Sequence, residues 1–442
     1  MKNFGVFSLI ILFFSCVSKI PAKEITEVPA KKIKPIHNMI AGTYTLVVEG
    51  YDWGAGASKI ILLLEEAVST VNKENYTIVA HKQAECQEIK YDVITGERTI
   101  LYAYVSDAKG TKIAEGNHVT LVLLVAPNLD ISSPMQYVYQ CRRNVWADYS
   151  LNIKDNSTSQ VWDTEADRIH PLVDDFDLTG KFIYNDDIAL TYADYVPVSQ
   201  EGKVPLIIWL HGGGEGGTDT TIPLLANRAT SYASPEIQAY FGGAHVLVPQ
   251  SPTFWMDNGT GDYTRGDVND MYNESVMALI KNYTSKYPNI DRDRIYVGGC
   301  SNGGYMSLKL MLLHPEYFAA SFPSALAYHT KYITDKQMES IKDMPIWFIH
   351  SKDDSVTKPE ETVVPAYKRL KAAGAENVHF SFYDHVVDLT GFYGGDDYHY
   401  SGHSSWIYSH RNHCTKDYDG TPVMLHGSPV TVMEWLAAQR KK

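Results

Sequence analysis

Residues 295–313 read IYVGGCSNGGYMSLKLMLL, and this stretch decides the fold that we expect. Its apolar start has the length of a buried strand and leads into the pentapeptide GCSNG at residues 299–303. A helical pattern follows at once. Small residues on both sides of a serine let a strand turn sharply into a helix and present the hydroxyl at the carboxyl edge of a sheet. The stretch therefore predicts strand, turn and helix, with Ser301 as a candidate nucleophile.

The same pattern continues on both sides of this turn, from residue 165 to the end of the chain. Further apolar runs of strand length are VPLIIWLHG, HVLVPQS, FAASFPS, MPIWFIHS and VHFSFYD. Helical patterns occur in VNDMYNESVMALIKNYTSKY, in PEETVVPAYKRLKAAG and at residues 429–439. Continuous apolar strands joined by helical crossovers indicate a mostly parallel sheet that is covered on both faces. We therefore expect one α/β domain over residues 165–442.

Residues 39–160 have a different pattern, in which short β-rich runs alternate with turn residues. The runs are TYTLVVEG, KIILLLEE, NYTIVAH, TILYAYVS, HVTLVLLV and MQYVYQC. Gly, Asn and Asp between them suit hairpin or Greek-key connections. Such a series of short strands predicts an all-β sandwich. The polar stretch from Asp155 to Asp175 lacks periodicity, so we expect the domain boundary there.

The first residues have the pattern of a targeting segment. Residues 1–16 contain Lys2, an apolar run from Phe4 to Phe14, and then Ser15-Cys16. The run is shorter than the roughly 20 residues that a membrane-spanning helix needs. Its end resembles a bacterial lipoprotein processing site, where Cys16 would be lipidated; the alternative is an ordinary secretory signal that is removed together with Cys16. Residues 17–38 would then form a linker, and the protein would be exported to the cell envelope or secreted.

Composition limits the partners and cofactors that we expect. A formal charge of -13 opposes contact with a phosphate backbone, so we expect no nucleic-acid partner. No cluster of Cys and His has metal-ligand spacing, so we expect no metal. An exported chain tolerates disulfides, and Cys86 could pair with Cys141, but spacing alone leaves the pairing open.

A serine hydroxyl is a weak nucleophile, so it needs a neighbouring base and an acid that orients this base. The segment HSKDD at residues 350–354 follows the strand PIWFI, in the loop where such an acid belongs. We favour Asp354 because the acid usually lies four residues beyond the histidine that ends this strand. Asp353 is the alternative; otherwise Asp353 and His350 are interpreted as polar residues that support the loop.

The base is expected in the loop after the last strand, which offers His385, His399, His403 and His410. Gly402 frees the backbone just before His403, and Trp406 just after it can form a wall of the site. We therefore predict His403 as the general base and Trp406 as a pocket residue. His399 and His410 are interpreted as surface or packing residues.

Attack on an acyl carbon places negative charge on the carbonyl oxygen, which then needs hydrogen-bond donors. The segment HGGGEGG at residues 211–217 follows the strand VPLIIWL, and its glycines let backbone N–H groups approach an acyl oxygen closely. We predict Gly213, Gly214 and the N–H of Asn302 as the oxyanion hole. Trp255, after the next strand, is predicted as a second pocket wall, with a position in the core as the alternative.

These segments together resemble bacterial serine esterases in which an immunoglobulin-like domain precedes an α/β-hydrolase related to prolyl-oligopeptidase-like and polyhydroxyalkanoate-depolymerase-like enzymes. The resemblance rests on VEGYDWGAGASKIIL and AYVSDAKG in the first domain, and on WLHGGGEGG, GGCSNGGYMSL, HSKDDSVT, YSGHSSWIY and VMEWLAAQ in the second. It implies hydrolysis of short-acyl esters and a first domain that promotes oligomerisation or shields the active site. It maps nucleophile, acid and base onto Ser301, Asp354 and His403. Ser351 departs from the glycine or alanine that is usual in this loop.

The expected reaction is ester hydrolysis through an acyl-enzyme, with no metal and no organic cofactor. The expected substrates are small short-acyl esters or the feruloyl and acetyl groups of polysaccharides. Contact with a membrane is expected only through the N-terminal lipid, and a homo-oligomer could form through the first domain. Two alternatives stay open: a prolyl-oligopeptidase-like peptidase, and a polysaccharide-binding envelope protein whose hydrolase domain is vestigial.

Overall fold

A computed structural model describes residues 42–198 and 202–441. The predicted targeting segment with Cys16 and the predicted linker at residues 17–38 lie outside the described residues. In the part of the chain that is described, no helix has both the length and the apolar character needed to cross a membrane.

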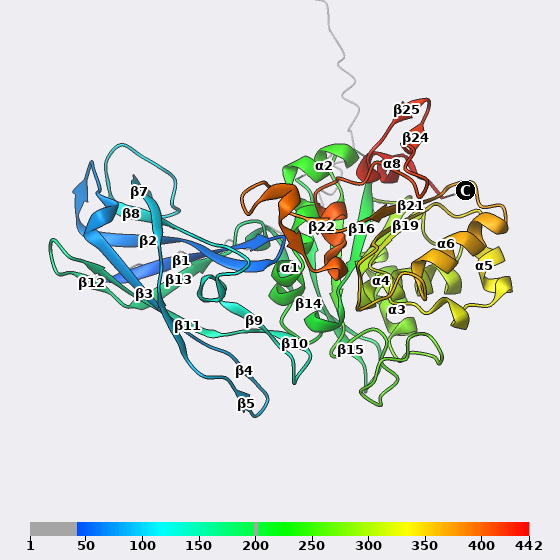
Figure 1. Ribbon diagram of the computed structural model, residues 1–442, viewed down its shortest axis with the longest axis horizontal. Coiled ribbons are helices and arrows are strands. Elements are labelled where there is room, and N and C mark those ends of the chain that lie inside the picture. The colour runs from blue at the N-terminus through cyan, green and yellow to red at the C-terminus, as the bar shows by residue number, and fades with distance from the viewer. Residues whose placement is uncertain (1–41, 199–201, 442) are drawn as a thin grey trace, which may run out of the picture. The chain divides into compact units, whose positions relative to one another are not determined.

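The N-terminal part of the described chain is a sandwich of two β-sheets (Figure 1). One sheet has the strand order β13-β1-β2-β8-β7, and the other has the order β12-β11-β3-β6. Buried side chains from both sheets, among them Leu46, Ile60 and Leu151, belong to one hydrophobic cluster. The strands are β1 Thr43–Tyr51, β2 Gly54–Val68, β3 Tyr76–Gln83, β6 Ile94–Glu97, β7 Ile100–Ser106, β8 Gly116–Leu123, β11 Asp148–Asp155, β12 Val161–Trp162 and β13 Thr164–Ile169. This is the all-β architecture that the sequence pattern predicts.

The last strand of the sandwich is β13. β13 pairs in parallel with β1, so the first sheet includes residues beyond 160, within the stretch from Asp155 to Asp175 in which the boundary is expected. The segment of β13 reads TEADRI, and it carries no apolar alternation that could identify it as a strand. Its pairing depends on the exposed edge of β1, which only the folded chain brings alongside.

The remaining residues form a mixed sheet of eight strands in the order β14-β15-β17-β16-β18-β19-β20-β21. All neighbouring pairs from β17 to β21 are parallel, whereas β14, β15 and β17 pair antiparallel. The strands are β14 Asp177–Ile183, β15 Ala189–Tyr195, β16 Val204–Leu210, β17 His245–Gln250, β18 Ile290–Cys300, β19 Ala320–Ser324, β20 Ile346–Ser351 and β21 Val378–Tyr383. The mostly parallel sheet of the expected fold class is thereby confirmed. The sequence pattern missed β14 and β15 because polar residues interrupt their apolar ones.

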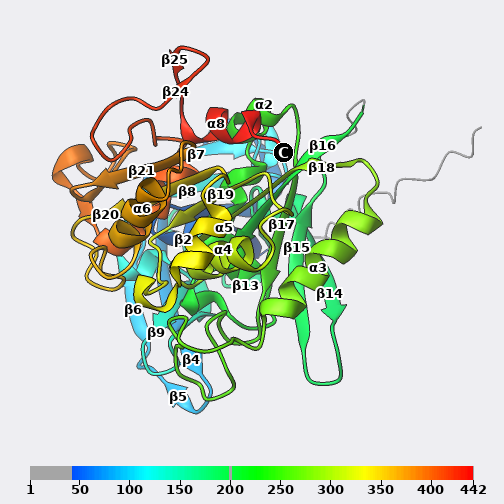
Figure 2. The same ribbon diagram turned by 90° about the vertical axis from the view of Figure 1, so that its right-hand side faces the viewer.

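Helices cover this sheet on both faces. The helices α3, α4, α5 and α6 lie on one side, and α1 and α2 lie on the side of the sandwich (Figures 1 and 2). The side chains of β16 alternate between two hydrophobic clusters: Leu206 and Ile208 join one, and Ile207 and Trp209 join the other. This two-sided burial explains why VPLIIWL is apolar throughout. The helices are α1 Thr221–Ala226, α2 Pro235–Phe241, α3 Asn273–Lys286, α4 Asn302–Leu313, α5 Asp335–Ile341, α6 Val363–Ala372, α7 Trp406–His410 and α8 Val432–Ala438.

A buried ion cluster joins the sandwich to the second domain. Asp52 lies between β1 and β2, and its carboxylate accepts from Arg228 at 2.8 Å and from Arg411 Nε at 2.9 Å. The Asp52 side chain is only 2% exposed. Replacing Asp52 would leave both guanidinium groups without this partner, so the cluster links the sandwich to the second domain.

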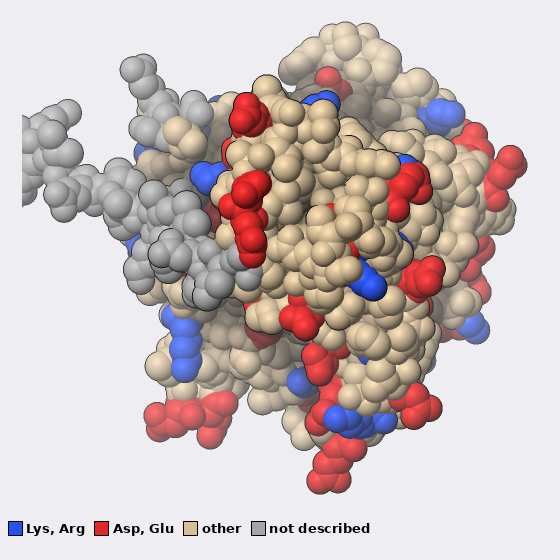
Figure 3. Space-filling view, turned by 90° about the vertical axis from the view of Figure 1, so that its left-hand side faces the viewer, with Lys and Arg blue, Asp and Glu red and all other residues tan. Residues whose placement is uncertain are grey.

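Cys86 and Cys141 form a disulfide, which answers the pairing that the sequence left open. Cys300 and Cys414 are buried free thiols. On the face shown in Figure 3, acidic side chains are interspersed with fewer basic ones, and the described residues there form no broad basic patch.

Candidate active site

Ser301 lies at the turn between β18 and α4. Its backbone has φ 55° and ψ -112°, a region that residues with a side chain rarely adopt. The Ser301 N–H donates to the Ser324 carbonyl at 3.0 Å, and the Ser301 carbonyl accepts from the Tyr305 N–H at 2.9 Å. A strained turn from strand to helix that is held in this way is the geometry of a nucleophile elbow.

The glycines around Ser301 are required by backbone packing. A Cβ on Gly303 would lie 1.9 Å from the Leu210 carbonyl oxygen. A Cβ on Gly299 would lie 2.4 Å from the Gly303 carbonyl oxygen. Neither oxygen can move away without a shift of β16 or α4, so the glycines of the motif reflect how closely α4 approaches the sheet.

Asp354 follows β20, and its side chain is fully buried. Its Oδ2 lies 2.9 Å from His403 Nδ1 and 3.1 Å from His350 Nε2. Its Oδ1 accepts from the backbone N–H groups of Val356 at 2.8 Å and Thr357 at 2.9 Å. Burial alone would raise the pKa of Asp354, but the hydrogen bonds from His350 and His403 outweigh it and hold this pKa well below its usual range. The carboxylate is therefore ionised and can orient the His403 ring.

Asp353, the alternative acid, has a different partner. One of its oxygens lies 2.9 Å from His385 Nδ1, and the other accepts from the Ser351 hydroxyl. The Asp353 side chain is 37% exposed, unlike that of Asp354. Asp353 and Ser351 thus support the loop, while Asp354 contacts His403.

His403 lies in the short turn Gly402–Ser404 (η8) of the loop in which the base is expected. Because Nδ1 donates to Asp354, Nε2 is the basic nitrogen of the ring. Ser301 and His403 line the same cavity, although no direct hydrogen bond joins them among the contacts of the described residues. Catalytic hydrogen bonds are often long before a substrate binds, so this separation is compatible with a nucleophile and its base.

The other histidines of this loop occupy supporting positions. His385 and His399 stack with their ring centres 4.3 Å apart. His410 packs against Trp209 at 4.8 Å, and burial lowers the pKa of His410 well below its ordinary value. His410 is therefore a neutral packing residue.

The glycine-rich segment forms the short turn Gly213–Glu215 (η4) after β16. Gly213, Gly214 and Asn302 line the cavity together with Ser301. A Cβ on Gly213 would lie 2.3 Å from the Tyr263 hydroxyl, so a side chain at this position would displace the tyrosine. The three residues predicted as oxyanion donors thus border the same space as the serine, as the chemistry requires.

Trp255 is not a wall of the cavity, and that prediction is wrong. Its side chain is completely buried, and its indole N–H donates to the His211 carbonyl at 3.1 Å. Its backbone N–H donates to the Asn302 side chain at 2.5 Å, so Trp255 connects the glycine-rich segment to the start of α4. Trp406 does line the cavity, with its ring edge-on to His403 at 5.5 Å.

The cavity has a volume of about 600 Å³, and the sequence pattern missed several residues that line it. Tyr137 and Tyr139 come from the sandwich, and Tyr263 comes from the loop after β17. These tyrosines belong to no local motif, because contacts between distant segments place them here.

Glu215 is a further lining residue, although it is only 4% exposed. Its Oε1 accepts from Asn144 Nδ2 at 2.6 Å, and its Oε2 has no hydrogen-bond partner among the described residues. Burial, opposed by hydrogen bonds from Asn144 and Asn227, raises the pKa of Glu215 to about 7. The position of Glu215 within HGGGEGG was the only sequence signal that could have identified it.

Two parts of the chain match known families. Residues 43–165 match the esterase Ig-like N-terminal domain, and residues 253–345 match the prolyl oligopeptidase family. Feruloyl esterase B of Neurospora crassa is 32% identical over 129 residues, which are 28% of this chain and 40% of that protein. The chain thus spans less than half the length of this curated relative.

A solved structure shows the same fold. The crystal structure of a thermostable esterase has a TM-score of 0.70 and 23% identity, and the match covers 90% of this chain and 99% of that one. The acylaminoacyl peptidase of Pyrococcus horikoshii has a TM-score of 0.37 and 16% identity over 52% of this chain and 39% of its own. At 23% identity the first match shows the fold alone. The second match has too low a TM-score to support an argument.

The fold and the site define an α/β-hydrolase that is preceded by an immunoglobulin-like domain. Within this class, the parts of the chain that match family models are similar to the esterase Ig-like N-terminal domain and to the prolyl oligopeptidase family.

Proposed function

We propose that this protein hydrolyses carboxylic esters by transferring the acyl group first to Ser301 and then to water. One observation carries the proposal. The buried carboxylate of Asp354 contacts His403 at 2.9 Å, and His403 shares a cavity with the strained Ser301 turn and the glycine-rich segment. This arrangement offers a nucleophile, a base, an orienting acid and backbone N–H groups in one place.

In the first step, Ser301 Oγ attacks the ester carbonyl carbon while His403 Nε2 takes the hydroxyl proton. The N–H groups of Gly213, Gly214 and Asn302 stabilise the oxyanion. The C–O bond to the alcohol then breaks, and His403 gives its proton to the leaving alcohol. In the second step, His403 deprotonates a water molecule, which attacks the acyl-enzyme. The bond between the acyl carbon and Ser301 Oγ breaks, His403 returns the proton to Ser301 Oγ, and the acid leaves. Asp354 stays ionised and stabilises the imidazolium in both steps.

We further propose short-acyl esters, or feruloyl and acetyl groups of polysaccharides, as substrates. The cavity of about 600 Å³ has the size of a small-molecule site, and one relative is named a feruloyl esterase. Export is proposed on two grounds: the pattern of residues 1–16, and the Cys86–Cys141 disulfide, which is typical of oxidising compartments.

The decisive test replaces the nucleophile. Ser301→Ala should lower kcat on p-nitrophenyl acetate and butyrate at least about 10⁴-fold and abolish labelling by a fluorophosphonate probe. Ser285→Ala is a matched control, because Ser285 is an exposed serine on α3 whose hydroxyl donates to the Lys281 carbonyl of the same helix. Near-normal turnover by the Ser301→Ala protein would defeat the proposal, and so would a wild-type protein that the probe does not label.

A peptidase is the second candidate, since residues 253–345 match the prolyl oligopeptidase family. The two sheets of the sandwich are unlike the repeated blades of a propeller, which would screen oligopeptides. Parallel assays of matched p-nitrophenyl esters and p-nitroanilides decide between the two. A higher kcat/KM for the amides would favour the peptidase.

A further inference from the structure

A hairpin of the immunoglobulin-like domain reaches the cavity of the second domain. It consists of β9 (Met135–Val138) and β10 (Arg143–Trp146), which pair antiparallel. Tyr137 and Tyr139 of this hairpin line the cavity that contains Ser301 and His403. The side chain of Tyr139 remains largely exposed at 79%, so structural packing does not account for this aromatic ring.

The strand β10 is attached to the second domain beside the glycine-rich segment. The Arg143 guanidinium donates to the Pro252 carbonyl at 3.0 Å, and the Trp146 indole N–H donates to the Thr221 hydroxyl at 2.9 Å. Asn144 donates to the buried Glu215 carboxyl at 2.6 Å. These three bonds come from one short strand, so they fix the hairpin in position and angle.

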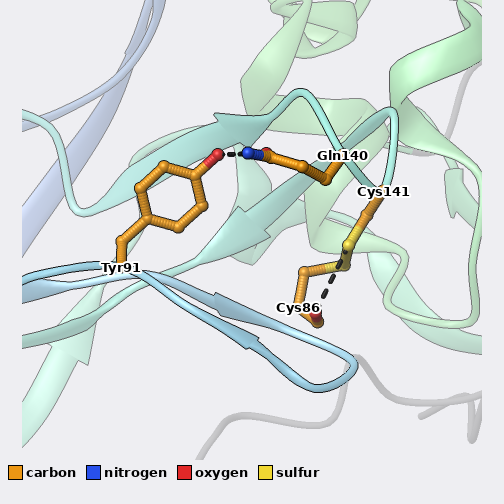
Figure 4. The surroundings of a disulfide bond; sticks show 4 residues. All are labelled: Cys86, Tyr91, Gln140 and Cys141. Atoms are coloured by element: carbon orange, nitrogen blue, oxygen red, sulfur yellow. Dashed lines mark hydrogen bonds between the residues drawn. A yellow bond between two sulfur atoms is a disulfide. The ribbon is translucent and has the colours of Figure 1, made fainter.

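The tip of the hairpin is held from the opposite side. Cys141 lies between β9 and β10, and its disulfide with Cys86 ties the tip to the small hairpin of β4 (Glu85–Cys86) and β5 (Ile89–Lys90) (Figure 4). Tyr91 donates to the Gln140 side chain beside this disulfide (Figure 4). Val138 packs with Cys86 in a small separate hydrophobic cluster. Tyr139 therefore lies next to a cross-linked turn, which holds its backbone beside the cavity.

Aromatic rings surround the reacting serine. Tyr137 and Tyr139 lie edge to face with ring centres 5.1 Å apart, and Tyr263 and Trp406 line the same cavity. Burial raises the pKa of Tyr263 to about 12, and it also raises the pKa of Tyr137, so both phenols stay neutral near pH 7. Neutral aromatic faces and edges attract a flat ring more strongly than an aliphatic chain of similar size.

We propose that the β9–β10 hairpin determines substrate preference by binding a planar ring carried by the ester, with Tyr139 as the principal contact and Tyr137 as its support. This inference rests on the proposed ester hydrolysis. It assigns to the first domain a direct part in substrate selection, beyond shielding the site. The ring belongs to the acyl group or to the alcohol, and the test separates the two.

Two matched pairs of esters serve as probes. Methyl 3-phenylpropanoate and methyl butanoate differ by a ring on the acyl side; benzyl acetate and butyl acetate differ by a ring on the alcohol side. For one of the pairs, Tyr139→Ala should lower kcat/KM on the ring-bearing ester about tenfold, mainly by raising KM. The kcat/KM on the aliphatic ester of that pair should change by no more than about twofold. Tyr139→Phe keeps the ring and should keep the preference.

Tyr102→Ala is the matched control, because Tyr102 on β7 is also an exposed tyrosine, at 54%, with a neighbouring tyrosine ring at 5.7 Å. An equal change of both members of each pair in Tyr139→Ala would overturn the inference and leave the proposed function intact. Failure of the wild-type protein to cleave any of the four esters would instead contradict the proposed function.

The disulfide provides a second test. The double variant Cys86→Ser and Cys141→Ser should remain folded by circular dichroism, since the main hydrophobic clusters lie elsewhere. In this variant the ratio of kcat/KM for the ring-bearing ester to kcat/KM for the aliphatic ester should fall about threefold to tenfold, as it does in Tyr139→Ala. A folded double variant with an unchanged preference would show that the disulfide does not hold the β9–β10 hairpin beside the cavity.

Discussion

Two walls of one cavity come from different parts of the chain, and different interactions hold them in place. The wall of the α/β domain contains Ser301, His403 and the glycine-rich segment, and close packing of backbone against backbone fixes it. The wall of the immunoglobulin-like domain contains Tyr137 and Tyr139, and a few polar bonds and one disulfide hold it. Under the two proposals above, the first wall carries out the ester hydrolysis and the second binds the ring of the substrate.

Apart from replacement of Ser301, the largest loss of activity is expected when the charge of Asp354 is removed. Asp354→Asn should lower kcat about 10³-fold to 10⁴-fold, because His403 would lose the partner that sets its tautomer and stabilises its cation. Asp353→Asn is the matched control and should stay within about threefold, since Asp353 bonds to His385 and Ser351. Steady-state assays on p-nitrophenyl acetate measure both, and equal losses would show that the acid has been assigned to the wrong residue.

A methyl group at Gly303 should displace the backbone that positions Ser301. Gly303→Ala places a Cβ 1.9 Å from the Leu210 carbonyl oxygen, so α4 must move away from the sheet and take Ser301 with it. We expect a fall in kcat/KM of about a hundredfold or more, together with a lower Tm. Gly96→Ala is the control, because its Cβ would meet only the Ile131 side chain at an ordinary 3.6 Å. Full activity of the Gly303→Ala protein would contradict the close packing described here.

The contact between the two walls can be broken at Asn144. Asn144→Ala removes the donor at 2.6 Å from Glu215 and leaves a buried carboxyl without this partner next to the predicted oxyanion donors. The expected result is a fall in kcat of about tenfold or less, with a smaller change in KM. Asn152→Ala, on the exposed side of β11, should have no effect. If only KM changed, the bond would serve substrate binding and not the placement of the glycine-rich segment.

The smallest expected effect is a pH dependence of stability that depends on Glu215. The pKa of Glu215 is raised from 4.5 to about 7, so the folded protein holds this proton more tightly than the unfolded chain. The stability that this provides is complete below pH 4.5 and is lost as the pH rises through about 7. Glu215→Gln keeps an acceptor for Asn144 and should flatten this part of the Tm curve by a few degrees. Parallel curves for wild type and variant, measured by differential scanning fluorimetry, would contradict the raised pKa.

The sequence pattern was most informative where one element alone decides the structure. The buried strands from β16 to β21 were predictable, because burial on both faces makes their residues apolar without interruption. The turn at Ser301 was also predictable, because only small residues permit it. β13 and β15 were not, because polar residues interrupt their apolar ones and pairing with neighbouring strands determines their conformation.

The candidate site was predictable to a similar depth. Order along the chain pointed to Ser301, Asp354 and His403, and the fold brings Asp354 and His403 into contact. The same reasoning could not place Trp255, because a tryptophan after a strand fits a pocket wall and a core equally well. Nor could it identify Tyr137 or Tyr139, which reach the cavity only because the two domains meet there.

What the sequence by itself determined is therefore the local chemistry: a strained serine, a glycine-rich turn, and an acid and a base in the expected loops. The tertiary structure alone decided which distant tyrosines border the serine and which of the two tryptophans, Trp255 or Trp406, lines the cavity. The reason is physical. Backbone strain, and the close approach of one backbone segment to another, limit which residue types fit at that one position. Contacts between domains are spread over many residues, so no single position carries a recognisable sequence pattern.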